Sequence, residues 1–283
     1  MENGLEQTLE ALTFLLRQTV TGKCAIALAG AHAKGTADGF SDIDLYVYAE
    51  DCIPYAARKR LIAESADSGR GIYVSEGLHD APWGGAMDFT YRGMPVEVAT
   101  RSLGEVERMV QESLAGRFEI FPATWTSNGY YTFIYLSEFQ FIQPLYDPDG
   151  VLEEYKRRTE AYPEALRRGI LRTFLERAGT WMNNFHYESA VRRSDILFAA
   201  PIVLHTVLDM LQVVFALNRT YFPGDKKLEA ALAGLKRCPE ALRTELDFLL
   251  RVSRDVREME RQRQLLHQIY WRLSAWVEQA LSE

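Results

Sequence analysis

Two short stretches near the N-terminus carry the residue types best suited to chemistry. They are residues 30–35 (GAHAKG) and residues 41–47 (SDIDLYV). An apolar run at 25–29 precedes the first stretch, and two aspartates open an apolar run in the second. Glycines at both ends of 30–35 predict a tight loop between two strands. The candidate chemistry therefore lies where one strand passes into the next.

Side-chain alternation along a strand predicts that Asp42 and Asp44 share one face. Ile43, Leu45 and Val47 then point to the opposite face and become buried. Two neighbouring carboxylates repel each other unless a cation offsets their charge, and Mg²⁺ prefers oxygen ligands. We therefore expect Asp42 and Asp44 to be metal ligands.

The glycine loop before this strand has the composition of a phosphate-binding loop. Gly30 and Gly35 lack side-chain bulk, so nearby backbone N–H groups can approach a phosphate, and a following helix would add the positive end of its dipole. Either feature alone is common in turns and on strand edges. A phosphate loop followed by metal carboxylates predicts nucleotide chemistry.

A known family signature matches these residues. Gly30, Gly35 and the run at 41–45 (SDIDL) resemble the signature of the nucleotidyltransferase superfamily, in particular its antibiotic-modifying adenylyltransferases. The resemblance implies Mg²⁺ and a nucleoside triphosphate, ATP, as co-substrate. The nucleotide-binding residues that we expect in this region are Gly30, Ala31, Lys34, Gly35 and Ser41. Ala31 departs from the family, which has a serine there to help hold the triphosphate, and this leaves backbone donors for that role.

A third carboxylate is expected in a hairpin further along the chain. Residues 86–91 and 94–100 form two predicted strands, joined through a tight Arg-Gly turn. Glu97 takes the face opposite Val96 and Val98, and a carboxylate within an apolar strand needs a reason. The resemblance implies that Glu97 acts as the base or shares in metal binding. Asp88, on the partner strand, remains an alternative.

The periodicity of the chain changes at about residue 150. Apolar positions at 5–16 predict a helix before the first strand, and a short strand at 141–146 ends in a turn at 147–150. Helical periodicity then continues from 151 to 283. We expect an α+β protein, with a nucleotidyltransferase-type mixed sheet and helices over 1–150 and an all-α helical bundle over 151–283. The active site is expected in the cleft between these domains.

Residues 196–217 are the most apolar part of the chain. Their length and composition are compatible with a membrane span, but Pro201, His205 and Asp209 interrupt the run. A buried central helix is the favoured interpretation, with no membrane association. His205 and Asp209 are then expected to be hydrogen-bonded core groups rather than ligands.

A loop at 218–227 separates this helix from the rest of the helical region. Its sequence, NRTYFPGDKK, ends in two lysines that begin a predicted helix capped by Asp225. The resemblance implies that Lys226 or Lys227 reaches the triphosphate, where a cation would offset charge on the leaving pyrophosphate. Two solvated lysines in a first helical turn are the alternative.

Composition restricts the partners and the compartment. A net charge of −7 and a pI of about 5.4 argue against a nucleic-acid-binding surface and suit a cationic or neutral small-molecule acceptor. Three scattered cysteines and no signal-peptide pattern predict a cytoplasmic protein. The resemblance implies an antibiotic acceptor, an aminoglycoside or a lincosamide. A protein acceptor, as in antitoxin-type transferases, and a non-catalytic nucleotide-binding module remain alternatives, as do monomer and homodimer.

Overall fold

The computed structural model describes residues 2–68, 71–124, 126–224 and 228–282. The chain forms two compact units, and neither is continuous in sequence. The first unit contains Met1–Glu112 and Tyr135–Ala161, and the second contains Ser113–Ile134 and Tyr162–Glu283. Residues 113–134 therefore precede position 150 in the chain but pack with the later helices. The domain boundary at 150 stays a prediction.

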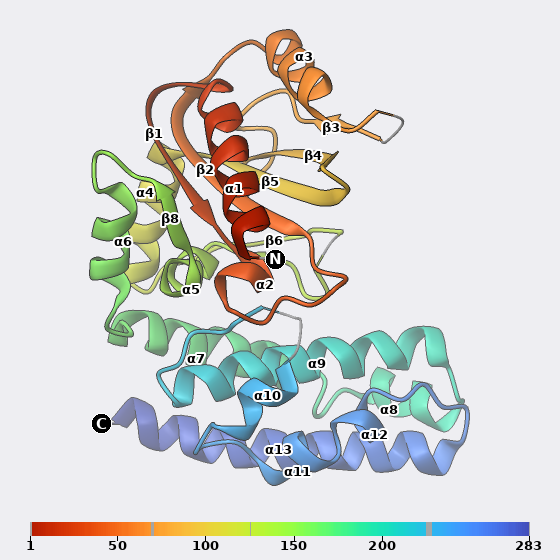
Figure 1. Cartoon of the computed structure of the whole chain (residues 1–283). Coiled ribbons are helices and arrows are strands. Elements are labelled where there is room, and N and C mark those ends of the chain that lie inside the picture. The colour runs from red at the N-terminus through yellow and green to blue at the C-terminus, as the bar shows by residue number, and fades with distance from the viewer. Residues whose placement is uncertain (1, 69–70, 125, 225–227, 283) are drawn as a thin grey trace. The chain divides into compact units, whose positions relative to one another are not determined.

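The first unit is built on a mixed sheet, which has six strands among the described residues, in the order β3-β4-β5-β2-β1-β8 (Figure 1). β2 and β5 run parallel, and the other neighbouring strands are antiparallel. The strands are β1 (Val20–Leu28), β2 (Ile43–Cys52), β3 (Tyr73–Val74), β4 (Gly85–Tyr91), β5 (Met94–Ser102) and β8 (Gln143–Tyr146). The predicted mixed sheet and its hairpin are confirmed.

One face of this sheet forms the hydrophobic core of the first unit. Ile43, Leu45 and Val47 of β2 are fully buried, as the alternation predicted. Helices α1 (Glu2–Arg17) and α3 (Tyr55–Ser65) contribute apolar side chains to the same core. The carboxylates of β2 must therefore project from the opposite face.

The opposite face packs against α5 (Ile134–Phe141), which the sequence did not predict. The ring centroids of Tyr48 on β2 and Phe139 on α5 are 5.9 Å apart, and Phe139 stacks on Tyr155 at 4.7 Å. Tyr155 belongs to α6 (Val151–Thr159), so α5 lies between the sheet and α6. Helix α4 (Leu103–Leu114) follows β5.

The second unit is a bundle of helices with one small two-stranded sheet. The helices are α7 (Glu164–Gly179), α8 (Phe185–Arg192), α9 (Ile196–Leu217), α10 (Leu228–Ala233), α11 (Glu240–Thr244), α12 (Leu246–Leu249) and α13 (Val256–Ser282). β6 (Ile120–Phe121) pairs with β7 (Tyr130–Tyr131). Phe118 and Phe133, which flank this sheet, contact Phe174 of α7, so aromatic packing joins the sheet to the bundle. The predicted helical bundle is confirmed.

α9 is the central helix of this bundle. Among the described residues it is the one helix long and apolar enough to cross a membrane, yet 61% of its most apolar window is buried, as in a core helix. Asp209 is only 4% exposed and is hydrogen-bonded, as expected. The expectation that His205 is a buried core group was wrong, because this side chain is exposed to solvent.

Candidate metal and nucleotide site

The register between β2 and β5 brings the predicted carboxylates together. In this parallel pair Asp44 lies directly beside Glu97, and Ile43 lies beside Val96. Partners in adjacent strands point to the same face of a sheet. Val96 and Val98 are each 1% exposed, so Glu97 must share the outer face with Asp44.

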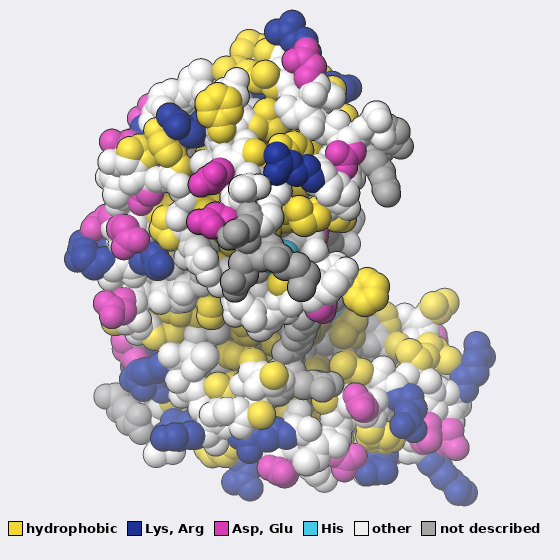
Figure 2. All heavy atoms as spheres, in the orientation of Figure 1, with side chains coloured by type: hydrophobic (Ala, Val, Ile, Leu, Met, Phe, Trp, Pro, Cys, Tyr) yellow, Lys and Arg dark blue, Asp and Glu magenta, His cyan; other side chains and the backbone are white. Residues whose placement is uncertain are grey.

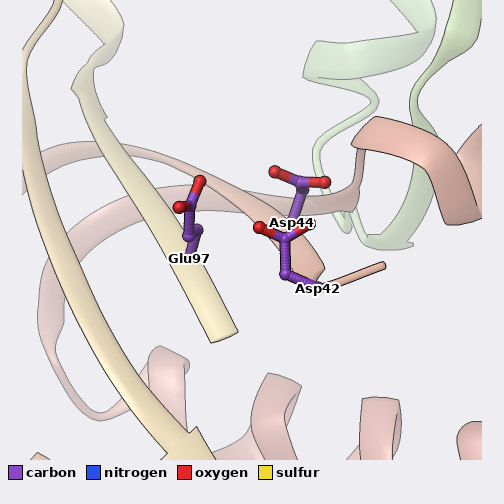
Figure 3. Close-up of side chains that lie close together, drawn as sticks. All are labelled: Asp42, Asp44 and Glu97. Atoms are coloured by element: carbon purple, nitrogen blue, oxygen red, sulfur yellow. The ribbon is translucent and has the colours of Figure 1, made fainter. Parts of the chain in front are cut away.

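Asp42, Asp44 and Glu97 form a compact group of oxygen donors (Figure 3). One carboxylate oxygen from each residue lies within 4.8 Å of the other two. Asp42 and Asp44 are partly buried, whereas Glu97 is exposed. Three carboxylates at this spacing repel one another, and a divalent cation that accepts oxygen ligands would remove that repulsion. The geometry fits a hard metal ion such as Mg²⁺.

Asp88, the alternative third carboxylate, lies on the same face one strand further out. It is directly opposite Glu97 in the antiparallel β4–β5 pair. Burial raises the pKa of Asp88 above its usual range. Its oxygens are not part of the group that lies within 4.8 Å. The structure therefore groups Glu97, rather than Asp88, with the two aspartates.

Gly30 packs directly against Asp44. A Cβ atom at position 30 would overlap the Oδ2 atom and the carboxyl carbon of Asp44, and the φ angle of +57° also favours glycine. The backbone N–H of Ala29 donates to the carbonyl of Asp44 (2.9 Å), which ties the end of β1 to β2. Only a residue without a side chain allows this close approach.

The predicted glycine loop consists of one helical turn followed by a loop. Residues Gly30–Ala33 form α2, and Gly35 follows with a φ of +67° and open space around it. Ser41, expected at the nucleotide, donates through Oγ to Oδ1 of Asp38 (3.1 Å) and accepts from the N–H of Asp38 (2.9 Å). The Ser41 hydroxyl thus holds the loop together.

Lys34 places a cation beside the carboxylates. Its Nζ lies 5.0 Å from the centroid of the Phe141 ring on α5. Partial burial lowers the pKa of Lys34, and the charges of Glu138 and Asp44 oppose that decrease. Both carboxylates therefore favour the charged ammonium. Lys34 therefore interacts electrostatically with Asp44, one of the grouped carboxylates.

A buried ion pair lies on this same face of the sheet, further along β5, and the sequence did not predict it. The Arg101 guanidinium, with 6% of its side chain exposed, donates to Oε1 of Glu138 (3.0 Å) and also contacts Oε2. It lies 4.0 Å from the Tyr46 centroid and 4.7 Å from that of Tyr135. Burial disfavours the charge on Arg101, but Glu138 keeps its pKa above the usual range. Strand alternation in the sequence could have predicted that Arg101 shares a face with Glu97, but not that it pairs with Glu138.

Two of the predicted nucleotide-binding residues, Lys226 and Lys227, lie outside the described residues, as does the predicted cap Asp225. The remaining predicted residues all belong to the first unit. Asp42, Asp44 and Glu97 form one group, Gly30 packs on that group, and Lys34 interacts electrostatically with it. Ala31 belongs to the same turn as Gly30.

Comparisons with known proteins show only distant similarity. The family described as "Domain of unknown function (DUF4037)" matches residues 134–228. No curated protein matches the sequence. A solved nucleotidyltransferase-like protein from Exiguobacterium sibiricum has 11% sequence identity and a TM-score of 0.43, and the match covers 97% of this chain and 75% of the other. A likeness at this level gives no information on chemistry.

Proposed function

We propose that this protein is a Mg²⁺-dependent nucleotidyltransferase. In the proposed reaction, a nucleoside monophosphate, AMP from ATP, passes to a hydroxyl group of a small molecule, and pyrophosphate leaves. The observation that carries this proposal is the group formed by Asp42, Asp44 and Glu97, whose ligand oxygens lie within 4.8 Å of one another. Such a group suits metal-assisted phosphoryl chemistry better than a purely structural role, because unpaired like charges destabilise a fold.

Each of the grouped carboxylates has a distinct proposed role. When bound, Mg²⁺ would neutralise triphosphate charge and help to align the α-phosphorus. Asp42 and Asp44 would hold the ion, and their partial burial suits a fixed ligand geometry. The exposed Glu97 carboxylate would accept the proton of the acceptor hydroxyl as its oxygen attacks, or share in holding the metal.

The residues around α2 would bind the nucleotide. Backbone N–H groups at Gly30, Ala31 and Gly35 can donate to phosphate oxygens, and the Lys34 ammonium can offset their charge. Ser41 would act indirectly by shaping the 35–42 loop through Asp38. Lys226 and Lys227 are proposed as further triphosphate contacts, on the resemblance alone.

The acceptor is proposed from the family resemblance and the charge of the chain. The SDIDL run resembles that of antibiotic-modifying adenylyltransferases, so an aminoglycoside or lincosamide hydroxyl is the favoured acceptor. A net charge of −7 suits a cationic small molecule. Ala31, which lacks the hydroxyl that the family has at this position, is the observation that favours the second candidate, a nucleotide-binding module without transfer activity.

Pyrophosphate release is the direct test. Purified protein is incubated with Mg²⁺, each of four nucleoside triphosphates, and a panel of aminoglycosides and lincosamides. The same panel is run on Asp44→Ala and on Asp51→Ala, an exposed aspartate at the far end of the same strand. Release that needs one acceptor, is lost in Asp44→Ala and persists in Asp51→Ala supports the proposal. Nucleotide binding without release across the panel favours the binding module or a protein acceptor.

A further inference from the structure

Asp42, Asp44 and Glu97 create an electrostatic problem for the nucleotide that the proposed function requires. One carboxylate oxygen from each lies within 4.8 Å of the other two, and a triphosphate that approaches them carries negative charge of its own. On the face shown in Figure 2, the described Lys and Arg side chains are scattered and mixed with Asp and Glu. A cation held beside the carboxylates would help the triphosphate to approach. Lys34 is a cation that the structure places there.

The turn that carries Lys34 is fastened to the end of α5 and the start of β8. Gln143, the first residue of β8, donates from Nε2 to the carbonyl of Ala33 (2.8 Å). The backbone N–H of Lys34 donates to the carbonyl of Gly30 (3.3 Å), which closes the α2 turn. The Nζ atom of Lys34 lies 5.0 Å from the centroid of the Phe141 ring on α5. The lysine side chain is therefore directed towards the last turn of α5.

Glu138 is a fixed anion on the same part of α5. It lies one turn before Phe141 on the same side of the helix, because residues three apart in a helix are neighbours. Arg101 donates to both of its carboxylate oxygens, with 3.0 Å between Nη2 and Oε1. Only 17% of the Glu138 side chain and 6% of the Arg101 side chain are exposed. The Glu138 carboxylate is therefore held in place, and a neighbouring cation must adjust to it.

Lys34 interacts with two carboxylates from different elements. The charges of Glu138 on α5 and Asp44 on β2 both favour the ammonium, and Glu138 has the larger effect. Charges of alternating sign thus lead from the buried Arg101 through Glu138 and Lys34 to Asp44. In such an order each charge is offset by its neighbours. Asp44 is a proposed metal ligand, so metal binding and the position of Lys34 are linked.

The two carboxylates differ in how they act on Lys34 once a metal ion is present. The ion offsets the charge of Asp44 and weakens its attraction for the ammonium, whereas Glu138 stays paired with Arg101. We propose that Glu138 is a positioning residue, which holds the Lys34 ammonium beside Asp44 so that it meets a phosphate of the nucleotide. This role depends on the proposed function, and it requires Lys34 to oppose the binding of metal alone and to favour the binding of nucleotide.

Lys34→Met separates these two effects. Without the cation, Mn²⁺ alone should bind about 5-fold more tightly, because a like charge beside Asp44 is removed. Affinity for α,β-methylene-ATP with Mg²⁺ should fall about 10-fold, because a charge-assisted contact with phosphate is lost. Titration calorimetry measures both, and Lys23→Met, a change at an exposed position of β1, should alter neither. Mn²⁺ affinity that does not rise in Lys34→Met, or nucleotide affinity that does not fall, overturns the proposal.

A double-mutant cycle tests Glu138 itself. Glu138→Gln keeps the shape of the side chain and an acceptor for Arg101 but removes the charge, and it should weaken binding of the same nucleotide about 5-fold. In the Lys34→Met background the change should cause no further loss, because Glu138 acts through Lys34. A loss of equal size in both backgrounds would assign Glu138 to the fold alone and overturn its positioning role.

Phe141→Leu provides a second cycle that leaves the pair of Arg101 and Glu138 intact. Phe141 is 38% exposed, so the change removes the ring beside Lys34 at little cost to the core. Nucleotide binding should weaken about 3-fold, and again only when Lys34 is present. An equal loss in both backgrounds, or no loss in either, would mean that α5 does not position the lysine.

The outcomes separate this role of Glu138 from the proposed function. If wild type shows these affinities but releases no pyrophosphate with any acceptor, the positioning role stands and transfer activity is rejected. If wild type releases pyrophosphate but the effects of Glu138→Gln and Lys34→Met add independently, the function stands and the positioning role is rejected. Wild type that binds no nucleotide rejects both.

Discussion

Gly30 controls the position of the Asp44 carboxylate. In Gly30→Ala the added Cβ must displace Asp44, so we expect Mn²⁺ affinity to fall about 10-fold or more, as after loss of support to a ligand. The positive φ adds roughly 1 kcal/mol of backbone strain. Titration calorimetry with Mn²⁺ measures the first effect, and urea denaturation the second.

Gly35→Ala is the matched control for this variant. Gly35 also has a positive φ, +67°, but nothing lies within 4 Å of the position where its Cβ would stand. We expect a similar cost in stability with little change in Mn²⁺ affinity. If both variants bind Mn²⁺ equally well, Asp44 is not held by contact with Gly30, and that part of the site description is wrong.

The identity of the third carboxylate can be decided with the metal alone. Glu97 belongs to the group of close oxygens, whereas Asp88 lies one strand further out. Glu97→Gln is therefore expected to weaken Mn²⁺ binding about 10-fold, and Asp88→Asn to change it by less than about 3-fold. Electron paramagnetic resonance of free Mn²⁺ measures both affinities. The reverse order would make Asp88 the third ligand.

Individual residues differ in how readily their roles follow from sequence. Alternation along a strand was sufficient to place Asp42 and Asp44 on one face and Ile43 on the other. The pairing of Arg101 with Glu138 was not predictable, because the two residues are 37 positions apart and meet only through tertiary packing. From the sequence, Gly30 predicted a loop but not the close contact with Asp44.

At the level of elements, long periodic segments were predicted and short or fully enclosed ones were missed. Helices α1 and α9 and strands β2, β4 and β5 lie close to their predicted positions, whereas β1 begins at Val20, well before the apolar run at 25–29. α5 was missed because apolar and aromatic side chains occur around its whole circumference, as Tyr135, Leu136 and Phe141 show. A helix covered on several sides has no amphipathic period to detect. β6 and β7, two residues each, exist only through their pairing.

The contact between α7 and α9 predicts a pH-dependent stability. Arg177 Nε donates to both carboxylate oxygens of Asp209 (3.1 and 3.2 Å), and Asn128 Nδ2 donates to one of them (2.8 Å). Burial raises the pKa of Asp209 above its ordinary 3.8, and the hydrogen bonds from Arg177 and Asn128, with the charges of Arg177 and His205, oppose the rise. Because the pKa of Asp209 is higher in the folded state than in the unfolded state, the folded protein binds more protons between these two pKa values. The ionised carboxylate therefore lowers the free energy of unfolding, and this loss develops as pH rises from the unfolded pKa through the folded pKa.

Arg177→Met should enlarge that cost. Without the guanidinium the folded pKa of Asp209 rises further, so at pH 7 the variant is expected to be about 3 kcal/mol less stable than wild type. The difference should narrow as pH falls below the folded pKa of Asp209, where the carboxyl becomes protonated in both proteins. Urea denaturation at several pH values measures it, with the exposed Arg172→Met on the same helix as control. A difference that does not change with pH would contradict an ionised Asp209.

At the level of the whole molecule, the two units take their residues from interleaved parts of the chain. The helical period that begins at 151 was visible in the sequence, but it does not reveal which unit a helix joins. α6 belongs to the first unit because Tyr155 stacks on Phe139 and Gln140 Nε2 donates to Thr159 Oγ1 (2.8 Å). Such assignments depend on contacts between distant segments, which periodicity does not record.

The stacking of Tyr155 on Phe139 predicts which of two N-terminal fragments is the more stable. A fragment of residues 1–150 lacks Tyr155, so the buried Phe139 loses its stacking partner, and we expect this fragment to be about 3 kcal/mol less stable than residues 1–161. Urea denaturation of both fragments measures the difference. Tyr155→Ala in the full chain should show a similar loss, which separates the effect from that of truncation. Equal stability of the two fragments would place the boundary at 150.

The parallel register of β2 and β5 also restricts how this chain can change length during evolution. The acidic face exists because Asp44 and Glu97 are register partners whose side chains point to the same face of the sheet. The positions that alternate with them, such as Leu45 and Val98, point to the other face and form the core. A one-residue deletion inside either strand exchanges the two faces, so it would expose apolar residues and bury a carboxylate. An insertion or deletion of two residues leaves the side chains on their original faces. Descendants that keep the site should therefore show length differences in loops such as 35–42, and only even ones within these strands.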